Sequence, residues 1–209
     1  MSVNYNLETG VKIYHDLIPY ALAQGIIDFL YDTTWKIGWS DKGWYDADVD
    51  AKYFYHDFVQ NIDGEMVPDG ILSTFLDCIQ ASPAWKENDL DKCSISRAVA
   101  NCVSIADITY KHRHKSKNAL VYHANLEWRP EWGGELFFYD PTGKRVEKVY
   151  EYTPGAVIIH DGPLVHHLKP PFKNGPKFRF SFGIFFEGIK NENTLGNNLY
   201  KIKSRNWYF

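Results

Sequence analysis

Short runs in which apolar and aromatic residues alternate with polar ones fill the second half of the chain. Such alternation is typical of strands, because successive side chains of a strand face opposite sides of a sheet. The runs occupy residues 94–110, 119–128, 134–139, 144–152, 156–160, 165–169 and 178–187. Short strands without helices between them predict a mainly β fold with flanking helices, and favour a double-stranded β-helix, a jelly-roll or cupin-like barrel.

Helical spacing of apolar residues occurs twice in the first half of the chain. Residues 18–32 carry Pro19 near their start, and residues 68–80 carry Asp69 near theirs, as expected of helix N-termini. We expect both segments to be amphipathic helices that pack against the sheet. Residues 35–55 are rich in aromatic side chains and predict loops and short strands. These loops either wall a substrate cleft or fill the packing between helix and sheet.

A length of 209 residues allows one sizeable core, and no second domain is expected. We divide the domain 1–209 into supporting helices and loops (1–95), a barrel core with a metal site (96–187) and a C-terminal tail (188–209). The formal net charge of −3 argues against a broad nucleic-acid-binding surface. No apolar run approaches the ~18 residues that span a bilayer, and no signal peptide is visible, so we expect a cytoplasmic protein without a membrane partner.

Cysteine and histidine are used differently in this chain. Three cysteines are too few and too irregularly spaced for a disulfide framework, and are expected to be reduced and buried. Six of the eight histidines lie within residues 110–181. His112 and His114 form an H-x-H pair, whose side chains would point the same way on a strand. Because imidazole commonly binds divalent transition metals, the pair predicts a metal site that takes a third ligand from a later strand.

Four motifs follow the H-x-H pair at characteristic spacing. They are NLEWRPEWGGEL at 125–136, GAVIIHDG at 155–162, VHHLKPP at 165–171 and FRFS at 178–181. Together they resemble the iron(II)/2-oxoglutarate-dependent dioxygenases of the prolyl-hydroxylase type over residues 96–187. The resemblance implies that His112 and His166 bind Fe(II) and that Arg179 anchors 2-oxoglutarate. Ser181 would add a hydroxyl to that pocket, and His123, where the family commonly has Tyr, is a candidate for its wall.

The activity that the resemblance implies is oxidation of a C–H bond, in most members a hydroxylation. Such an enzyme uses O2 and converts 2-oxoglutarate to succinate and CO2, and needs no catalytic residue beyond the metal site. The sequence does not choose between a small molecule and an amino-acid or peptide side chain as the substrate, because loops determine that choice in this fold.

One position departs from the family pattern, because His114 stands where the family has a carboxylate ligand. A three-His face leaves the same positions open but adds one positive charge, which makes the higher oxidation states of iron harder to reach. Two other functions therefore stay open. One is a three-His metal dioxygenase that does not use 2-oxoglutarate, and the other is a catalytically silent metal-binding domain of the same fold.

Several individual residues also have alternative interpretations. His114 could turn away and leave a two-His site, or the register could place Ser116 at the carboxylate position. His167 would face away from His166 on a strand and lie beside the site or at the surface. His160 is expected in the core or at the rim. Arg179 could instead form a structural salt bridge, because a buried charge needs a partner.

Overall fold

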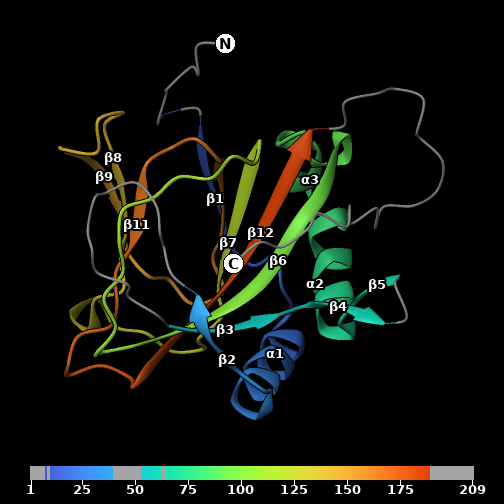
Figure 1. Ribbon diagram of the computed structural model, residues 1–209, viewed down its shortest axis with the longest axis horizontal. Coiled ribbons are helices and arrows are strands. Elements are labelled where there is room, and N and C mark those ends of the chain that lie inside the picture. Colours follow the sequence, from blue (N-terminus) through green and yellow to red (C-terminus); the bar gives the residue numbers. More distant parts are fainter. Residues whose placement is uncertain (1–7, 9, 40–52, 63–64, 189–209) are drawn as a thin grey trace.

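The computed structural model describes residues 8, 10–39, 53–62 and 65–188. An antiparallel sheet of seven strands, in the order β1-β10-β7-β12-β6-β3-β2, forms its largest element (Figure 1). The strands are β1 (Val11–Tyr14), β10 (Val157–Asp161), β7 (Asn118–His123), β12 (Phe178–Gly188), β6 (Cys93–Ser104), β3 (Tyr53–Asp57) and β2 (Lys36–Trp39).

Two smaller sheets and a few helices complete the described fold. The three-stranded sheet has the order β11-β8-β9, and β4 and β5 form a two-stranded sheet. These strands are β11 (His166–Leu168), β8 (Leu136–Tyr139), β9 (Val146–Tyr150), β4 (Val59–Ile62) and β5 (Glu65–Pro68). The helices are α1 (Tyr20–Asp32), α2 (Gly70–Ala81), α3 (Pro83–Glu87) and the 3-10 turns η1 (Leu90–Lys92) and η2 (Pro130–Trp132). The prediction of a mainly β fold with flanking helices is confirmed.

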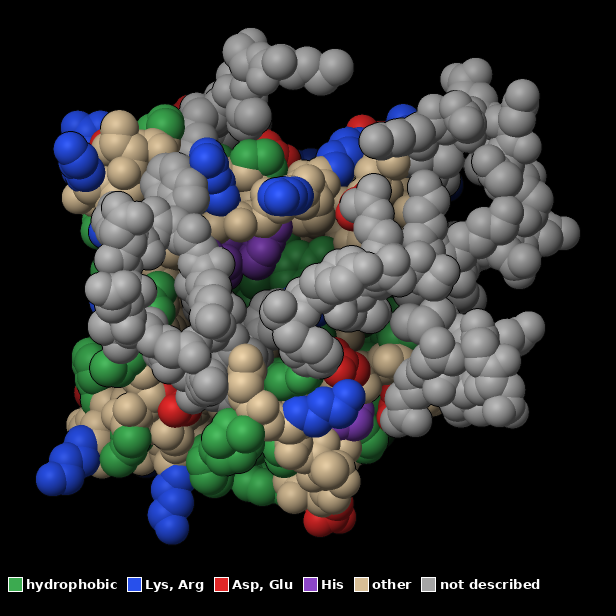
Figure 2. All heavy atoms as spheres, in the orientation of Figure 1, with side chains coloured by type: hydrophobic (Ala, Val, Ile, Leu, Met, Phe, Trp, Pro, Cys, Tyr) green, Lys and Arg blue, Asp and Glu red, His purple; other side chains and the backbone are tan. Residues whose placement is uncertain are grey.

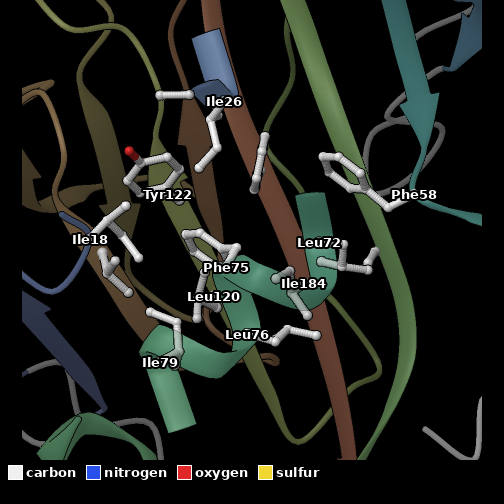
Figure 3. Close-up of a cluster of buried hydrophobic side chains, with 14 of the residues drawn as sticks. Ile18, Ile26, Phe58, Leu72, Phe75, Leu76, Ile79, Leu120, Tyr122 and Ile184 are labelled. Atoms are coloured by element: carbon white, nitrogen blue, oxygen red, sulfur yellow. The ribbon is translucent and has the colours of Figure 1, made fainter. Parts of the chain in front are cut away.

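The two long helices cover one face of the large sheet. Phe75 of α2 lies 5.0 Å from the ring of Tyr122 on β7 and 5.4 Å from that of Phe182 on β12 (Figure 3). Asp69 caps α2, because its side chain accepts a hydrogen bond of 2.9 Å from the amide of Ile71. Both helices thus carry apolar side chains at helical spacing on one face, and burial of that face against the sheet stabilises them.

The opposite face of the large sheet meets the three-stranded sheet. A second apolar cluster fills the space between them and comprises Val11, Leu136, Phe138, Ile158 and Leu164. Alternation along the strands separates the two cores: Leu120 and Tyr122 of β7 belong to the helix side, whereas Val121 packs on the second cluster. Side chains on this second face of the large sheet therefore point into the space between the two sheets.

Strand ends differ from their predicted positions. The run 119–128 pairs only as far as His123, and the run 94–110 only as far as Ser104. Strands β1, β4 and β5 and helix α3 were not predicted. Trp35 stacks 5.7 Å from Phe180, which favours ordinary packing for this part of the aromatic segment, and residues 40–52 lie outside the described residues. The cysteines are free, with Cys93 and Cys102 buried.

A buried polar network ties the segment after β7 to β12. The amide of Phe180 donates to Asn125 Oδ1 at 2.8 Å, and Asn125 Nδ2 donates to the carbonyl of Phe178 at 3.2 Å. The hydroxyl of Tyr152 lies 2.8 Å from Asn125 Oδ1 and 2.5 Å from the Phe180 carbonyl. It also accepts the amide of Asn125 at 3.2 Å. Arg179 is therefore held between two anchored residues.

We predict that Tyr152→Phe destabilises the protein, because it removes the acceptor of the buried Asn125 amide and one of the donors to Asn125 Oδ1 and to the Phe180 carbonyl. The free energy of unfolding should fall by about 1–3 kcal/mol, as measured by urea denaturation. Tyr20→Phe is the control, since Tyr20 is 73% exposed, and should change stability by less than about 0.5 kcal/mol. Equal stability of Tyr152→Phe and the wild type would show that the network contributes nothing.

Candidate metal centre

Backbone hydrogen bonds fix the H-x-H segment beside β11. The amide of His112 donates to the carbonyl of His166 and the amide of His166 donates to the carbonyl of His112, each at 2.9 Å. The amide of His114 donates to the carbonyl of Gly162 at 2.8 Å. A Cβ at position 162 would collide with the carbonyl of Ser116, so only glycine allows this approach. The loop is thereby fixed at two points.

The three histidines that the sequence singled out as ligands lie together. One ligand atom from each of His112, His114 and His166 lies within 4.8 Å of the others. The ring centroids are 4.4 Å apart for His112 and His166, and 4.9 Å apart for each of the other two pairs. His114 has not turned away from the other two rings.

Hydrogen bonds to backbone carbonyls set the tautomers of two of these rings. Nδ1–H of His112 donates to the carbonyl of Tyr110 at 3.0 Å, and Nδ1–H of His166 donates to the carbonyl of Leu164 at 2.8 Å. The lone pair of each ring is therefore on Nε2. This arrangement is common among metal-binding histidines, whose second nitrogen is usually held by an acceptor.

Burial favours the neutral form of two of these imidazoles. It lowers the pKa of His114 to about 2, with a smaller contribution from His112, and it lowers the pKa of His166 well below its ordinary value. Metals bind the neutral form, so no proton competes for the nitrogens of His114 and His166 near neutral pH. Neutral nitrogen donors at this separation fit a divalent transition metal such as iron, nickel or zinc.

A cavity extends from the histidines between the two sheets. Figure 2 shows the hollow, with histidine side chains on its wall and apolar side chains beside them. Arg179, Ser181, Gly183 and Phe185 line it at alternate positions of β12. The remaining lining residues are Val99, Asn101, Val103, Thr109, Val121, Leu136, Leu168 and Phe182, with the three histidines. The cavity therefore joins the histidine group to the guanidinium of Arg179.

Arg179 is buried at the other end of this cavity. The side chain is 1% exposed, and its guanidinium carbon lies 6.0 Å from the ring centre of Tyr152. A Cβ at Gly134 would lie 3.1 Å from Arg179 Cδ and 3.0 Å from Trp128, and φ at this position is +85°. Glycine is therefore needed at this end as well, for space and for backbone conformation.

A row of polar residues crosses the sheet next to Arg179. Ser181 pairs with Asn101 of β6 on one side and with His123 of β7 on the other. Asn101 and Thr109 line the cavity and were missed by the sequence reasoning. For Asn101 a signal existed, because it is a polar residue at an inward position of an alternating strand. His123 lies beside Ser181 on β7 and is not among the residues that line the cavity.

The ring of His123 is buried and oriented by its neighbours. It is 0% exposed and stacks on Tyr152 at 4.1 Å with an interplanar angle of 13°. The amide of Thr153 approaches Nδ1 at 3.2 Å, and the Thr153 carbonyl already accepts the amide of Ala156. The Thr153 amide needs an acceptor and the Thr153 carbonyl already has a donor. Nδ1 of His123 therefore carries the lone pair, and the proton is on Nε2. Nε2 has no hydrogen-bond partner among the described residues.

His167 points away from the histidine group, as predicted, and is buried rather than at the surface. Its Nε2–H donates to Thr109 Oγ1 at 2.8 Å, and Thr109 in turn donates to the carbonyl of Leu168 at 2.8 Å. The bond fixes Thr109, which lines the cavity. His167 therefore supports the wall of the site from behind.

The chain resembles known proteins in its structure, whereas its sequence matches none of them closely enough to show a family. No protein-family model and no curated protein sequence matches the chain. A 2OG-Fe(II) oxygenase family oxidoreductase from Burkholderia pseudomallei aligns with a TM-score of 0.63 and 15% identity, over 86% of each chain. A Trichoplax adhaerens prolyl hydroxylase, solved with a hypoxia inducible factor peptide fragment, aligns at 0.59 and 13%, over 86% of this chain and 84% of that one.

A third neighbour was solved with metal and cosubstrate. HygX from Streptomyces hygroscopicus, with nickel and 2-oxoglutarate bound, aligns with a TM-score of 0.56 and 7% identity, over 84% of this chain and 82% of that one. The fold is the double-stranded β-helix. This confirms the predicted fold class, and at such low identity the comparison carries no residue roles. Among the described residues, no helix of this barrel protein is long and apolar enough to span a bilayer.

We predict that His123 makes stability depend on pH. Burial and the charge of Arg179 lower the pKa of His123 to about 3. The unfolded chain takes up this proton below about pH 6.5, whereas the folded protein stays neutral, so stability falls as the pH falls. His123→Phe should reduce the slope of unfolding free energy against pH by about 1.4 kcal/mol per unit, between about pH 6 and 5. Identical slopes would show that the folded protein protonates His123.

Proposed function

We propose that this protein is an iron(II)/2-oxoglutarate-dependent oxygenase that oxidises a C–H bond of its substrate. One observation carries the proposal: the imidazoles of His112, His114 and His166 lie at one end of a cavity whose other end is the buried guanidinium of Arg179. A transition metal fits the first end, and a carboxylate fits the second. 2-Oxoglutarate is a ligand that can reach both.

The three histidines would hold the metal. One ring nitrogen of each comes from a loop or from β11, and three such ligands would leave positions on the ion for other molecules. Bound Fe(II) and 2-oxoglutarate would supply the oxidising chemistry, in which O2 is consumed and succinate and CO2 are released. The chain itself binds, orients and excludes water, and Leu136, Val121 and Phe185 provide apolar walls for this purpose.

Arg179 would anchor the distal carboxylate of 2-oxoglutarate. A guanidinium can donate two parallel hydrogen bonds to a carboxylate, and this pairing is stronger in a buried site than in water. Ser181 lies two positions further on the same face of β12 and offers a hydroxyl. Nε2–H of His123 on one side of Ser181 and the amide of Asn101 on the other are further donors within the same row.

The charges of this site favour a dianion. Three neutral imidazoles leave Fe(II) with both of its positive charges, and Arg179 adds a third at the far end of the cavity. A carboxylate ligand, as in a 2-His-1-carboxylate site, would remove one of these charges. 2-Oxoglutarate offsets two of them, so we expect tight cosubstrate binding together with slower use of O2 than in a carboxylate-containing site.

We propose a small molecule or an amino-acid or peptide side chain as the substrate, and not a nucleic acid. Among the neighbours, the Trichoplax enzyme was solved with a peptide and HygX with hygromycin B. These two neighbours support a peptide side chain and a small molecule as substrate classes for this chain. The hollow of about 320 Å³ that His167, Lys169 and Phe172 help to line lies on the outer side of β11 and is not part of the approach to the histidine group.

The clustering of His114 with the other two histidines supports a second candidate, a three-His dioxygenase that does not use 2-oxoglutarate. Succinate formation under air separates the two. Release of succinate by the Fe(II)-loaded protein supports the first function, and His114→Asp should raise it by returning a negative charge to the metal. Succinate from His114→Asp alone would instead support a catalytically silent domain.

We predict that single ligand substitutions abolish stoichiometric metal binding. His112→Ala and His166→Ala should each weaken Fe(II) binding by more than about a hundredfold, since even residues that only orient a ligand contribute about 10–100-fold. Equilibrium dialysis with metal analysis measures this. His114→Ala should also lose affinity, whereas His167→Ala should retain it. Unchanged metal content in both the His112 and His166 variants would disprove the site.

We predict that Arg179→Ala weakens 2-oxoglutarate binding to the Fe(II)-loaded protein without lowering its metal content. Loss of a buried charge partner costs about 2–5 kcal/mol, so the dissociation constant should rise at least tenfold. Anaerobic titration, followed by the visible absorption of the iron chelate, measures this constant. Arg145→Ala is the matched control, because Arg145 is 77% exposed and pairs with Glu147 at the surface. If the Arg179 variant and the wild type bind 2-oxoglutarate with equal affinity, the candidate that remains is the three-His dioxygenase that does not use 2-oxoglutarate.

A further inference from the structure

A fourth histidine lies against the metal centre. His160 belongs to β10 and is 1% exposed. Its ring centroid is 4.5 Å from that of His166 and 6.3 Å from that of His114, and Phe138 packs on it at 5.3 Å. The ring thus lies on the His166 side of the histidine group, between the two sheets of the barrel.

The hydrogen bonding of His160 resembles that of the proposed ligands. Nδ1–H donates to the carbonyl of Asp161 at 2.9 Å, so the lone pair is on Nε2. Nε2 is buried and has no hydrogen-bond partner among the described residues. His112 and His166 also donate Nδ1–H to a backbone carbonyl. His167 differs, because its Nε2 is already bonded to Thr109.

An unpartnered lone pair in the core needs an explanation. A buried acceptor without a donor is unfavourable, and most such groups in folded proteins are satisfied. Phe138 packs on His160 and has no hydrogen-bond donor, and His166 on the other side donates its own proton to the carbonyl of Leu164. A metal ion held by the neighbouring histidines is an electron-pair acceptor that would satisfy this nitrogen.

We propose that His160 is a fourth imidazole ligand of the metal centre and approaches the ion from the side of His166. The inference rests on the metal-binding part of the proposed function and not on 2-oxoglutarate. In the structure the tight group consists of His112, His114 and His166. His160 is the outer member, and metal binding draws its Nε2 towards the ion.

Four imidazoles would change what the centre can bind. An octahedral ion would then have two open positions, which a bidentate 2-oxo acid fills. A further ligand could enter only after His160 leaves. His160 would therefore strengthen metal binding and restrict the access of further ligands to the ion. Like the absence of a carboxylate ligand, this would slow the use of O2.

The test counts imidazoles and measures affinity on the whole protein loaded with Cu(II) alone. Pulsed electron paramagnetic resonance of Cu(II) detects coordinated imidazole nitrogens, and competition with a chelator gives the dissociation constant. His160→Phe keeps a ring against His166 and Phe138 but removes the nitrogens. His56→Phe is the matched control, because His56 is also buried among aromatic rings, with Nδ1 hydrogen-bonded and Nε2 without a partner among the described residues.

We expect four imidazoles in the wild type and in His56→Phe, and three in His160→Phe with a dissociation constant raised at least about tenfold. Three imidazoles in the wild type would overturn the inference, and this measurement does not depend on how well any variant folds. Metal binding through three imidazoles together with binding of 2-oxoglutarate would leave the proposed function intact. If the wild type binds no metal, both this inference and the proposed function are wrong.

Discussion

The candidate site depends on one pair of reciprocal backbone hydrogen bonds, between His112 and His166. These residues are 54 positions apart in the chain, and the bridge places their rings 4.4 Å apart. Because the bonds run between main-chain groups, the approach of the two rings does not depend on a metal. The bond from His114 to Gly162 then brings the third ring to the same place. The site is thus preorganised by the barrel, which lowers the conformational cost of binding an ion.

The alternation of β12 connects this site to the rest of the cavity. Its even-numbered phenylalanines pack under the helices, while Arg179, Ser181 and Phe185 face the interior between the sheets. Arg179 is 1% exposed in this strand, so its positive charge lies away from water at the wall of the cavity. The network of Asn125 and Tyr152 fixes the backbone on both sides of it. We interpret this rigid, buried cation as an anchor for an anionic ligand.

Much of the fold followed from periodicity, and the limits of that reasoning are physical. Helices α1 and α2 were predicted to within two residues, because packing on one face requires regular apolar spacing. The end of β7 at His123 was not predicted, because the side chain of Asn125 replaces strand pairing by bonds to β12. The grouping of His112, His114 and His166 was anticipated from motifs. The positions of Asn101 beside Ser181 and of His160 beside His166 depend on cross-strand register, which a single sequence does not specify.

Metal and 2-oxoglutarate should bind as coupled ligands if they share one cavity. A dianion that contacts the ion would raise the affinity for it, and by linkage the ion would raise the affinity for the dianion by the same factor. The most direct measurement is the dissociation constant of Fe(II), determined under anaerobic conditions with and without saturating 2-oxoglutarate. The account predicts that 2-oxoglutarate lowers this constant at least tenfold, because the dianion would contact both the ion and Arg179. An Fe(II) affinity that is unchanged by 2-oxoglutarate would contradict a shared site.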